Sequence, residues 1–128
     1  MQARVLLMEP DSHMRRVRLK ALEAAGFSVR TAADPTSAVA GASDGWPDIA
    51  VLNLSSPRVE AMDLLWRMTR LERPVPVIIS DPPPAWGERL TSWVGESFSH
   101  QSPQLRQDMD AAVRAMDKCA GFGLLTLV

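Results

Sequence analysis

Three short apolar runs of this sequence end in polar side chains that could take part in chemistry. Glu9 and Asp11 follow the first run, Asn53 ends the second, and Ser80 ends the third. Such runs, bounded by turn residues, are typical of strands buried on both faces of a parallel sheet. In open α/β sheets the chemistry takes place beyond the carboxyl ends of the strands, so a functional side chain is expected at Asn53.

Asn53 poses the main functional question, because a side-chain amide is a poor nucleophile and a poor metal ligand. It either hydrogen-bonds neighbouring loop amides, as a buried polar group must do somehow, or keeps a residual ligand role. Ser80 either caps a turn or takes part in a site, and Glu9 is either functional or a solvated remnant. His13 and His100 are isolated in the sequence, which gives no metal-ligand spacing.

The pattern around these residues predicts strands that alternate with helices. Strands are expected at Val5–Met8, Phe27–Thr31, Ile49–Leu54, Val75–Ser80 and Glu96–His100. Helices are expected from Asp11 or Ser12 to Gly26, from Asp34 to Ala42, between Pro57 and Pro74, from Ala85 to Val94, and from Ser102 onward. This alternation predicts a doubly wound α/β fold with a five-stranded parallel sheet in the order 2-1-3-4-5.

Two of these helices have features that bear on function. In the first, an apolar stripe contains Met14 and Leu22, and the basic residues, Arg18 among them, are expected mostly on the opposite, solvent-facing side. The fourth is expected to be short or distorted, because Pro82–Pro84 stiffen the loop that leads into it.

The composition limits the classes of function. The chain has 128 residues, of which 46% are hydrophobic and 23% charged, with a formal net charge of −1. These values are ordinary for one globular domain and favour neither a nucleic-acid nor a membrane surface. The one cysteine, Cys119, excludes an internal disulfide and suits a reducing cytosol. Glu9 and Asp11 interrupt the N-terminal apolar run, which argues against a signal peptide, so a cytoplasmic location is expected.

Residues 1–119 form the expected main domain, and residues 120–128 form an apolar tail that contains Phe122. The tail either packs on its own domain or provides an added strand or a self-association surface. Trp86 and Trp93, on or beside the fourth helix, either pack inward or bind a partner, since tryptophan is enriched at binding hot spots. Together these apolar groups predict a homodimer. Trp46 and Trp66 are interpreted as packing residues.

Taken together, several segments make the chain resemble a response-regulator receiver domain, the CheY-like and flavodoxin-like fold of two-component signal transduction. The resemblance covers about residues 4–117 and rests on Val5-Leu-Leu-Met-Glu-Pro-Asp11, Leu22–Ala32, Pro47–Pro57 and Pro74–Ser80. It implies a cleft in which two adjacent acids bind Mg²⁺ and an aspartate accepts a phosphoryl group. A Ser or Thr and a lysine complete that cleft.

Matched to this resemblance, the sequence keeps few of the reactive groups. Glu9 keeps the first acid and Ser80 the hydroxyl, whereas Pro10 replaces the second acid and Asn53 the acceptor. Asp11 lies outside the implied metal pair. The lysine position falls on Gln101 or Ser102, and no lysine occurs between Lys20 and Lys118.

The resemblance therefore implies a degenerate, atypical pseudo-receiver that is not an enzyme and needs no cofactor or metal. Its expected role is phosphorylation-independent protein–protein interaction in signalling or transcriptional regulation, with no nucleic-acid or membrane binding. The alternative is a divergent but active receiver that accepts a phosphoryl group or binds another small ligand in the same cleft.

Overall fold

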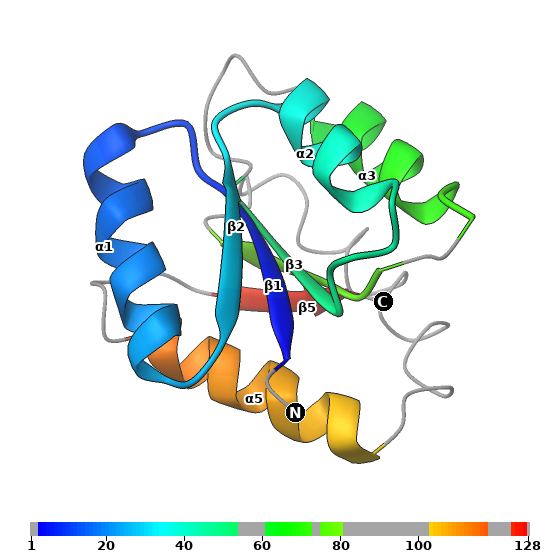
Figure 1. Cartoon of the computed structure of the whole chain (residues 1–128). Helices are drawn as coiled ribbons and strands as arrows, with labels where there is room; N and C mark the ends of the chain where they lie inside the picture. The colour runs from blue at the N-terminus through cyan, green and yellow to red at the C-terminus, as the bar shows by residue number, and fades with distance from the viewer. Residues whose placement is uncertain (1–2, 54–60, 73–74, 81–102, 118–123, 128) are drawn as a thin grey trace.

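The computed structural model describes residues 3–53, 61–72, 75–80, 103–117 and 124–127. These residues form a five-stranded sheet with helices on both faces (Figure 1). In chain order, the strands are Arg4–Met8 (β1), Ser28–Ala32 (β2), Ile49–Asn53 (β3), Val77–Ser80 (β4) and Leu124–Leu127 (β5). The helices are Ser12–Ala24 (α1), Pro35–Ala42 (α2), Ala61–Thr69 (α3) and Pro103–Asp117 (α5).

The sheet has the order β2-β1-β3-β4-β5, and β1 to β4 pair in parallel. The register places Leu7 of β1 between Thr31 of β2 and Val51 of β3, and it places Asn53 opposite Ser80. The parallel α/β architecture predicted from the sequence is confirmed for these four strands. Because they run in one direction, their carboxyl ends meet at one edge.

The prediction that all five strands are parallel is wrong. β5 is antiparallel to β4, with Leu125 opposite Ile79, and it comes from the C-terminal tail. The segment Glu96–His100, which was expected to supply the fifth strand, lies outside the described residues, as does the expected fourth helix. One edge of β4 pairs with β3, and its other edge would present unpaired backbone N–H and C=O groups if the tail did not pair with it.

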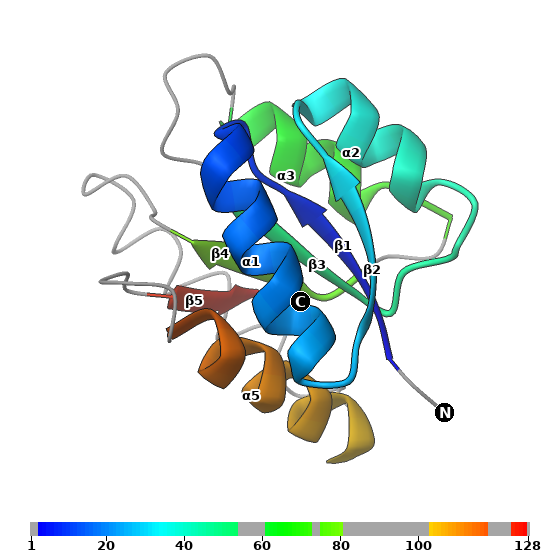
Figure 2. The same ribbon diagram turned by 60° about the vertical axis from the view of Figure 1, so that its left-hand side comes forward.

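Two apolar cores lie on the two faces of the sheet. Figures 1 and 2 show α2 and α3 covering one face and α1 and α5 the other. Alternate strand residues such as Leu6 and Leu52 pack with α2 and α3, and their neighbours such as Leu7 and Val51 pack with α1 and α5. A sheet covered on both faces needs apolar side chains at successive positions. This is why β1 and β3 are continuous apolar runs instead of alternating patterns.

The helix starts follow directly from the sequence. Asp11 caps α1 by accepting a 2.8 Å hydrogen bond from the backbone N–H of Met14. Asp34 caps α2 by accepting a 2.8 Å hydrogen bond from the backbone N–H of Ser37, and Pro35 is the first residue of that helix. The hydrogen bond from Ser37 lowers the pKa of Asp34. Because the cap at Asp11 is only three residues beyond the end of β1, α1 begins at the edge where the strands end.

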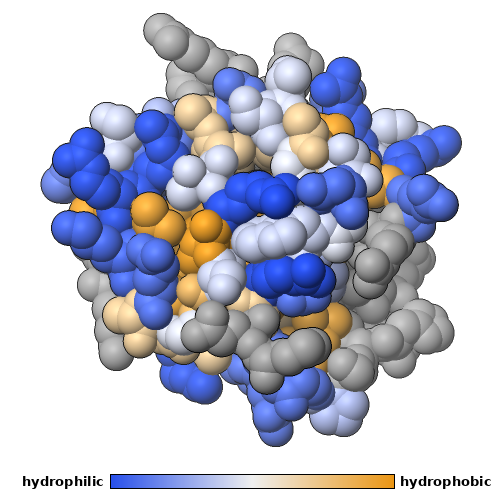
Figure 3. Space-filling view, viewed as in Figure 1, coloured by the Kyte–Doolittle hydropathy of each residue, from blue (hydrophilic) through white to orange (hydrophobic). Residues whose placement is uncertain are grey.

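The two tryptophans within the described residues have different environments. Trp46 is half-buried, and the guanidinium of Arg30 lies 4.4 Å from its ring centroid, in line with a packing role. Trp66 is 53% exposed, with the guanidinium of Arg70 at 4.0 Å. The interpretation of Trp66 as a packing residue is therefore wrong, because it faces away from the core face of α3 that carries Leu64 and Met68. Elsewhere, the face shown in Figure 3 is mostly hydrophilic, with small separate hydrophobic areas.

Candidate functional site

Glu9, Asn53 and Ser80 come together at the carboxyl edge of the sheet, as the sequence predicts. Glu9 follows β1, Asn53 ends β3 and Ser80 ends β4. All three are buried, with exposed fractions of 1%, 8% and 0%. The alternative reading of Glu9 as a solvated remnant is therefore wrong. A carboxylate this deeply buried needs hydrogen-bond donors around it.

The Glu9 carboxylate is the centre of a hydrogen-bond network. Its Oε1 accepts one hydrogen bond from Nδ2 of Asn53 and one from Nη1 of Arg18, each 2.7 Å long. Its Oε2 accepts the backbone N–H of Asp11 at 3.1 Å. The main-chain oxygen of Glu9 also accepts Nη1 of Arg15 at 2.9 Å. Both carboxylate oxygens are therefore engaged by donors of the same chain.

Arg18 is the residue of the cleft that the sequence reasoning missed. It was expected on the solvent-facing side of α1, but it is 1% exposed. Its Nη1 donates to Glu9 and also to Oγ of Ser80 at 2.9 Å. One guanidinium nitrogen thus links Glu9, at the end of β1, to Ser80, at the end of β4. Arg18 and Ser80 are 62 residues apart in the sequence.

The sequence did contain a signal for this burial. Met14, Arg18 and Leu22 are spaced four residues apart, which places them on one face of a helix. Arg18 therefore belongs to the same face as the apolar stripe. An arginine in a core needs a paired acid, and Glu9 at the end of the preceding strand is close enough in the chain to supply it.

Asn53 and Ser80 both make side-chain contacts with the Glu9–Arg18 pair. Asn53 directs its amide nitrogen to the Glu9 carboxylate, so a side chain and not a loop amide is its partner in this contact. This orientation follows from charge, because the amide oxygen would be repelled by the carboxylate. Ser80 Oγ accepts the Arg18 N–H and lies 3.5 Å from the carbonyl oxygen of Leu52.

The cleft residues do not fit a magnesium site. Mg²⁺ prefers oxygen ligands in octahedral geometry, usually including one or two carboxylates with accessible lone pairs. Here both Glu9 oxygens already accept N–H groups, Asn53 presents nitrogen to Glu9, and Pro10 has no donor atom in its side chain. Among the described residues, no group of three or more His, Cys, Asp or Glu side chains could hold a metal ion.

Several predicted site residues fall outside the described residues. These are the candidates for the lysine position, Gln101 and Ser102, and the candidates for partner binding, Trp86, Trp93 and Phe122. Asp11 is described and is exposed, and its carboxylate caps α1 while its backbone N–H binds Glu9.

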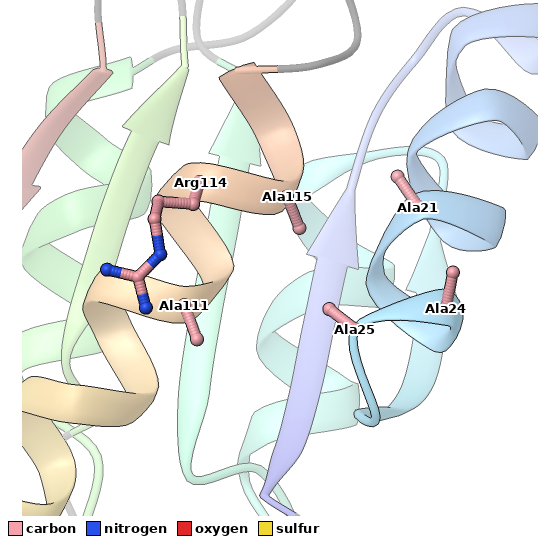
Figure 4. A pocket seen from close by; sticks show the side chains of 6 residues that line it. All are labelled: Ala21, Ala24, Ala25, Ala111, Arg114 and Ala115. Carbon is pink, nitrogen blue, oxygen red and sulfur yellow. The ribbon is translucent and has the colours of Figure 1, made fainter.

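A separate groove lies between α1 and α5 and has a volume of about 290 Å³. Figure 4 shows the residues that line it: Ala21, Ala24, Ala25, Ala111, Arg114 and Ala115. None of these residues belongs to the Glu9 network. A groove lined by alanine methyl groups and one arginine does not indicate which ligand it would bind.

Comparison with known proteins finds parts of larger proteins that are similar to this chain. The chain is 30% identical over 78 residues to the C4-dicarboxylate transport transcriptional regulatory protein DctD of Pseudomonas aeruginosa, a match that covers 61% of this chain and 17% of DctD. It is 35% identical over 88 residues to protein-glutamate methylesterase/protein-glutamine glutaminase 2 of Xanthomonas campestris, covering 67% of this chain and 25% of that protein. No family model matches the sequence.

Among solved structures, the chemotaxis response regulator CheY4 of Vibrio cholerae superimposes with a TM-score of 0.63 at 16% identity, covering 94% of this chain and all of that chain. The chain has the fold of a response-regulator receiver domain. The expected receiver fold is thereby confirmed. The matched segment is at most a third of the length of the curated relatives, so this receiver domain resembles only a part of each. No helix in the described parts of the chain is long and apolar enough to cross a bilayer.

Proposed function

We propose that this receiver domain acts in signalling or transcriptional regulation through protein–protein contacts that do not depend on phosphorylation. The observation that carries the proposal is the hydrogen bond from Nδ2 of Asn53 to Glu9, at the strand end where the resemblance places a phospho-acceptor. An amide whose N–H donates a hydrogen bond to a buried carboxylate offers no anionic oxygen to attack phosphorus.

The charge balance of the cleft supports the same proposal. Phosphoryl transfer depends on cations that neutralise the charge on the transferring group. Among the described residues, the cleft contains one buried carboxylate, Glu9, and one buried guanidinium, Arg18, and these two form an ion pair at 2.7 Å. A phosphoryl group placed here would stand beside Glu9 and compete with it for the same cation.

The wider setting of the domain is proposed from its relatives and its surface. DctD is by name a transcriptional regulatory protein, and so is PrrA of Mycobacterium tuberculosis, to which 76 residues match at 29% identity. We place the domain in the cytoplasm as a non-enzymatic module with a protein partner. Its formal net charge of −1 gives no electrostatic basis for nucleic-acid binding. A homodimer remains part of the proposal, with Trp86, Trp93 and Phe122 as candidate contacts.

The test is phosphoryl uptake in the presence of Mg²⁺, measured on the wild type, on Asn53→Asp and on Pro10→Asp/Asn53→Asp. Beryllium fluoride binding is followed by calorimetry, and acetyl phosphate labelling is followed by intact-protein mass spectrometry. A receiver that keeps its acidic pair and aspartate serves as the positive control. We expect no uptake by the wild type or by Asn53→Asp, because Pro10 still leaves the acidic pair incomplete.

Mg²⁺-dependent beryllium fluoride binding by the wild type would overturn the proposal in favour of a divergent active receiver. Partner capture from the host's lysate, with and without acetyl phosphate, tests the interaction role. The same partners should be recovered under both conditions. A partner recovered only after acetyl phosphate treatment would contradict independence from phosphorylation.

A further inference from the structure

We propose that Arg18 is the resident cation of the cleft, a guanidinium tethered to α1 that occupies a cation site formed by Glu9 and Ser80, with Asn53 bonded to the same Glu9 oxygen. Removing the Arg18 side chain should then leave a site for a free guanidinium-type cation. With the acidic pair restored, the same removal should leave a site for Mg²⁺. The inference deepens the proposed function, but its tests measure cation binding and not phosphorylation.

The geometry of the contacts supports a built site. Nη1 of Arg18 donates to Glu9 Oε1 at 2.7 Å and to Ser80 Oγ at 2.9 Å. The pair is sealed from solvent, with exposed side-chain fractions of 1% for Arg18 and 2% for Glu9. A buried ion pair is maintained only where the geometry is good and further hydrogen bonds satisfy the charged groups. The bonds from Asn53 and Asp11 to Glu9 meet that need on the acidic side.

The position of Arg18 on α1 explains how its guanidinium reaches the cation site. The cap at Asp11 starts the helix three residues after β1, and Arg18 follows Met14 on the inward face. The guanidinium therefore reaches the strand ends at no translational cost, because it is part of the chain. Guanidinium is also more weakly hydrated than an ammonium and presents directed N–H donors, which suits burial beside a carboxylate and a hydroxyl.

The same contacts explain the exclusion of a metal. A divalent ion would have to bind the Glu9 oxygen that Arg18 already occupies, and the two cations would repel each other. Restoring acids at positions 10 and 53 adds negative charge without removing this competitor. Arg18 is thus expected to limit Mg²⁺ binding even in a cleft with a rebuilt acidic pair.

The first test is chemical rescue of Arg18→Ala. Thermal unfolding is followed by circular dichroism with millimolar methylguanidinium chloride and, separately, with the same concentration of sodium chloride. Arg16→Ala is the matched control, because Arg16 is an exposed arginine of the same helix. Methylguanidinium at ten times its dissociation constant should raise the folding equilibrium constant of Arg18→Ala about 11-fold, and leave the wild type and Arg16→Ala unchanged.

If Arg18→Ala is unfolded without the ligand, the same titration should restore its folded circular dichroism signal. Equal effects of methylguanidinium and sodium chloride on Arg18→Ala would overturn the proposal, whether or not the variant is folded at the start.

The second test compares the Mg²⁺ affinity of Pro10→Asp/Asn53→Asp with that of the same protein carrying Arg18→Met. Calorimetry should show at least a tenfold gain when Arg18 is removed. Equal affinities would show that Arg18 does not compete with the metal and would overturn the proposal. Phosphorylation of the wild type would contradict the proposed function and leave these two cation measurements unaffected.

Discussion

Replacement of Arg18 by methionine, alone and together with Glu9→Gln, tests the energetic role of the buried ion pair. Methionine keeps much of the length and apolar bulk of the arginine stem and removes the charge. The single change leaves Glu9 buried as an uncompensated carboxylate, with the Asn53 amide and the Asp11 N–H as its remaining described donors. The double change removes both charges and retains the volume of the site.

The magnitude follows from the burial of the two groups. Both side chains of this 2.7 Å pair are at most 2% exposed, so little solvent screening reduces the effect. Breaking a buried pair by removing one partner costs about 3–5 kcal/mol, whereas replacing both partners by groups of similar volume is often nearly neutral. For a domain of this size, the single change should lower Tm by about 10–20 °C. Glu9→Gln alone should also be destabilising, because it leaves the guanidinium buried without its acid.

The assay is urea unfolding at 25 °C, followed by circular dichroism, for the wild type, the two single variants and the double variant. Arg16→Met is the control on the same helix, and as an exposed substitution it should change stability by less than ~0.5 kcal/mol. The double variant should be more stable than the sum of the single effects predicts, with a coupling free energy of ~2 kcal/mol or more.

Additive effects of Glu9→Gln and Arg18→Met would refute this reasoning. An Arg18→Met variant as stable as Arg16→Met would do the same. Either outcome would mean that the guanidinium contributes no more than a solvated surface arginine does.

Three further predictions concern the surroundings of the cleft and the edges of the sheet. Ser80→Ala removes one acceptor of Arg18 and should cost ~1–3 kcal/mol by urea unfolding, with Thr31→Ala as an exposed strand control. Deletion of residues 124–128 unpairs the outer edge of β4, so it should lower stability by ~1 kcal/mol per lost backbone hydrogen bond and promote aggregation in sedimentation experiments. An unchanged unfolding midpoint after this deletion would count against the β4–β5 pairing. Asp34→Asn should reduce acid sensitivity, because the lowered pKa of Asp34 contributes stability at neutral pH that is lost as the pH falls below about 4. Identical pH profiles of unfolding for Asp34→Asn and the wild type would contradict that role.

Local patterns in the sequence were sufficient to predict much of this fold. Continuous apolar runs identified β1, β3 and β4, because strands covered on both faces need apolar side chains at successive positions. Asp34 and Pro35 predicted the start of α2, because capping is decided within a few residues of the chain. The meeting of Glu9, Asn53 and Ser80 followed from the parallel direction of those strands.

Two features were decided by the tertiary structure and were not predicted from the sequence. One is the direction and origin of β5, since an apolar segment pairs with whichever sheet edge is open to it, and periodicity does not encode direction. The other is the burial of Arg18. Arginine is usually solvated, and its position in the core becomes favourable only when the fold brings Glu9 and Ser80 to the same point from different strands. Local sequence patterns determine which segments form strands and helices, whereas the burial of a charge depends on partners that only the folded chain brings together.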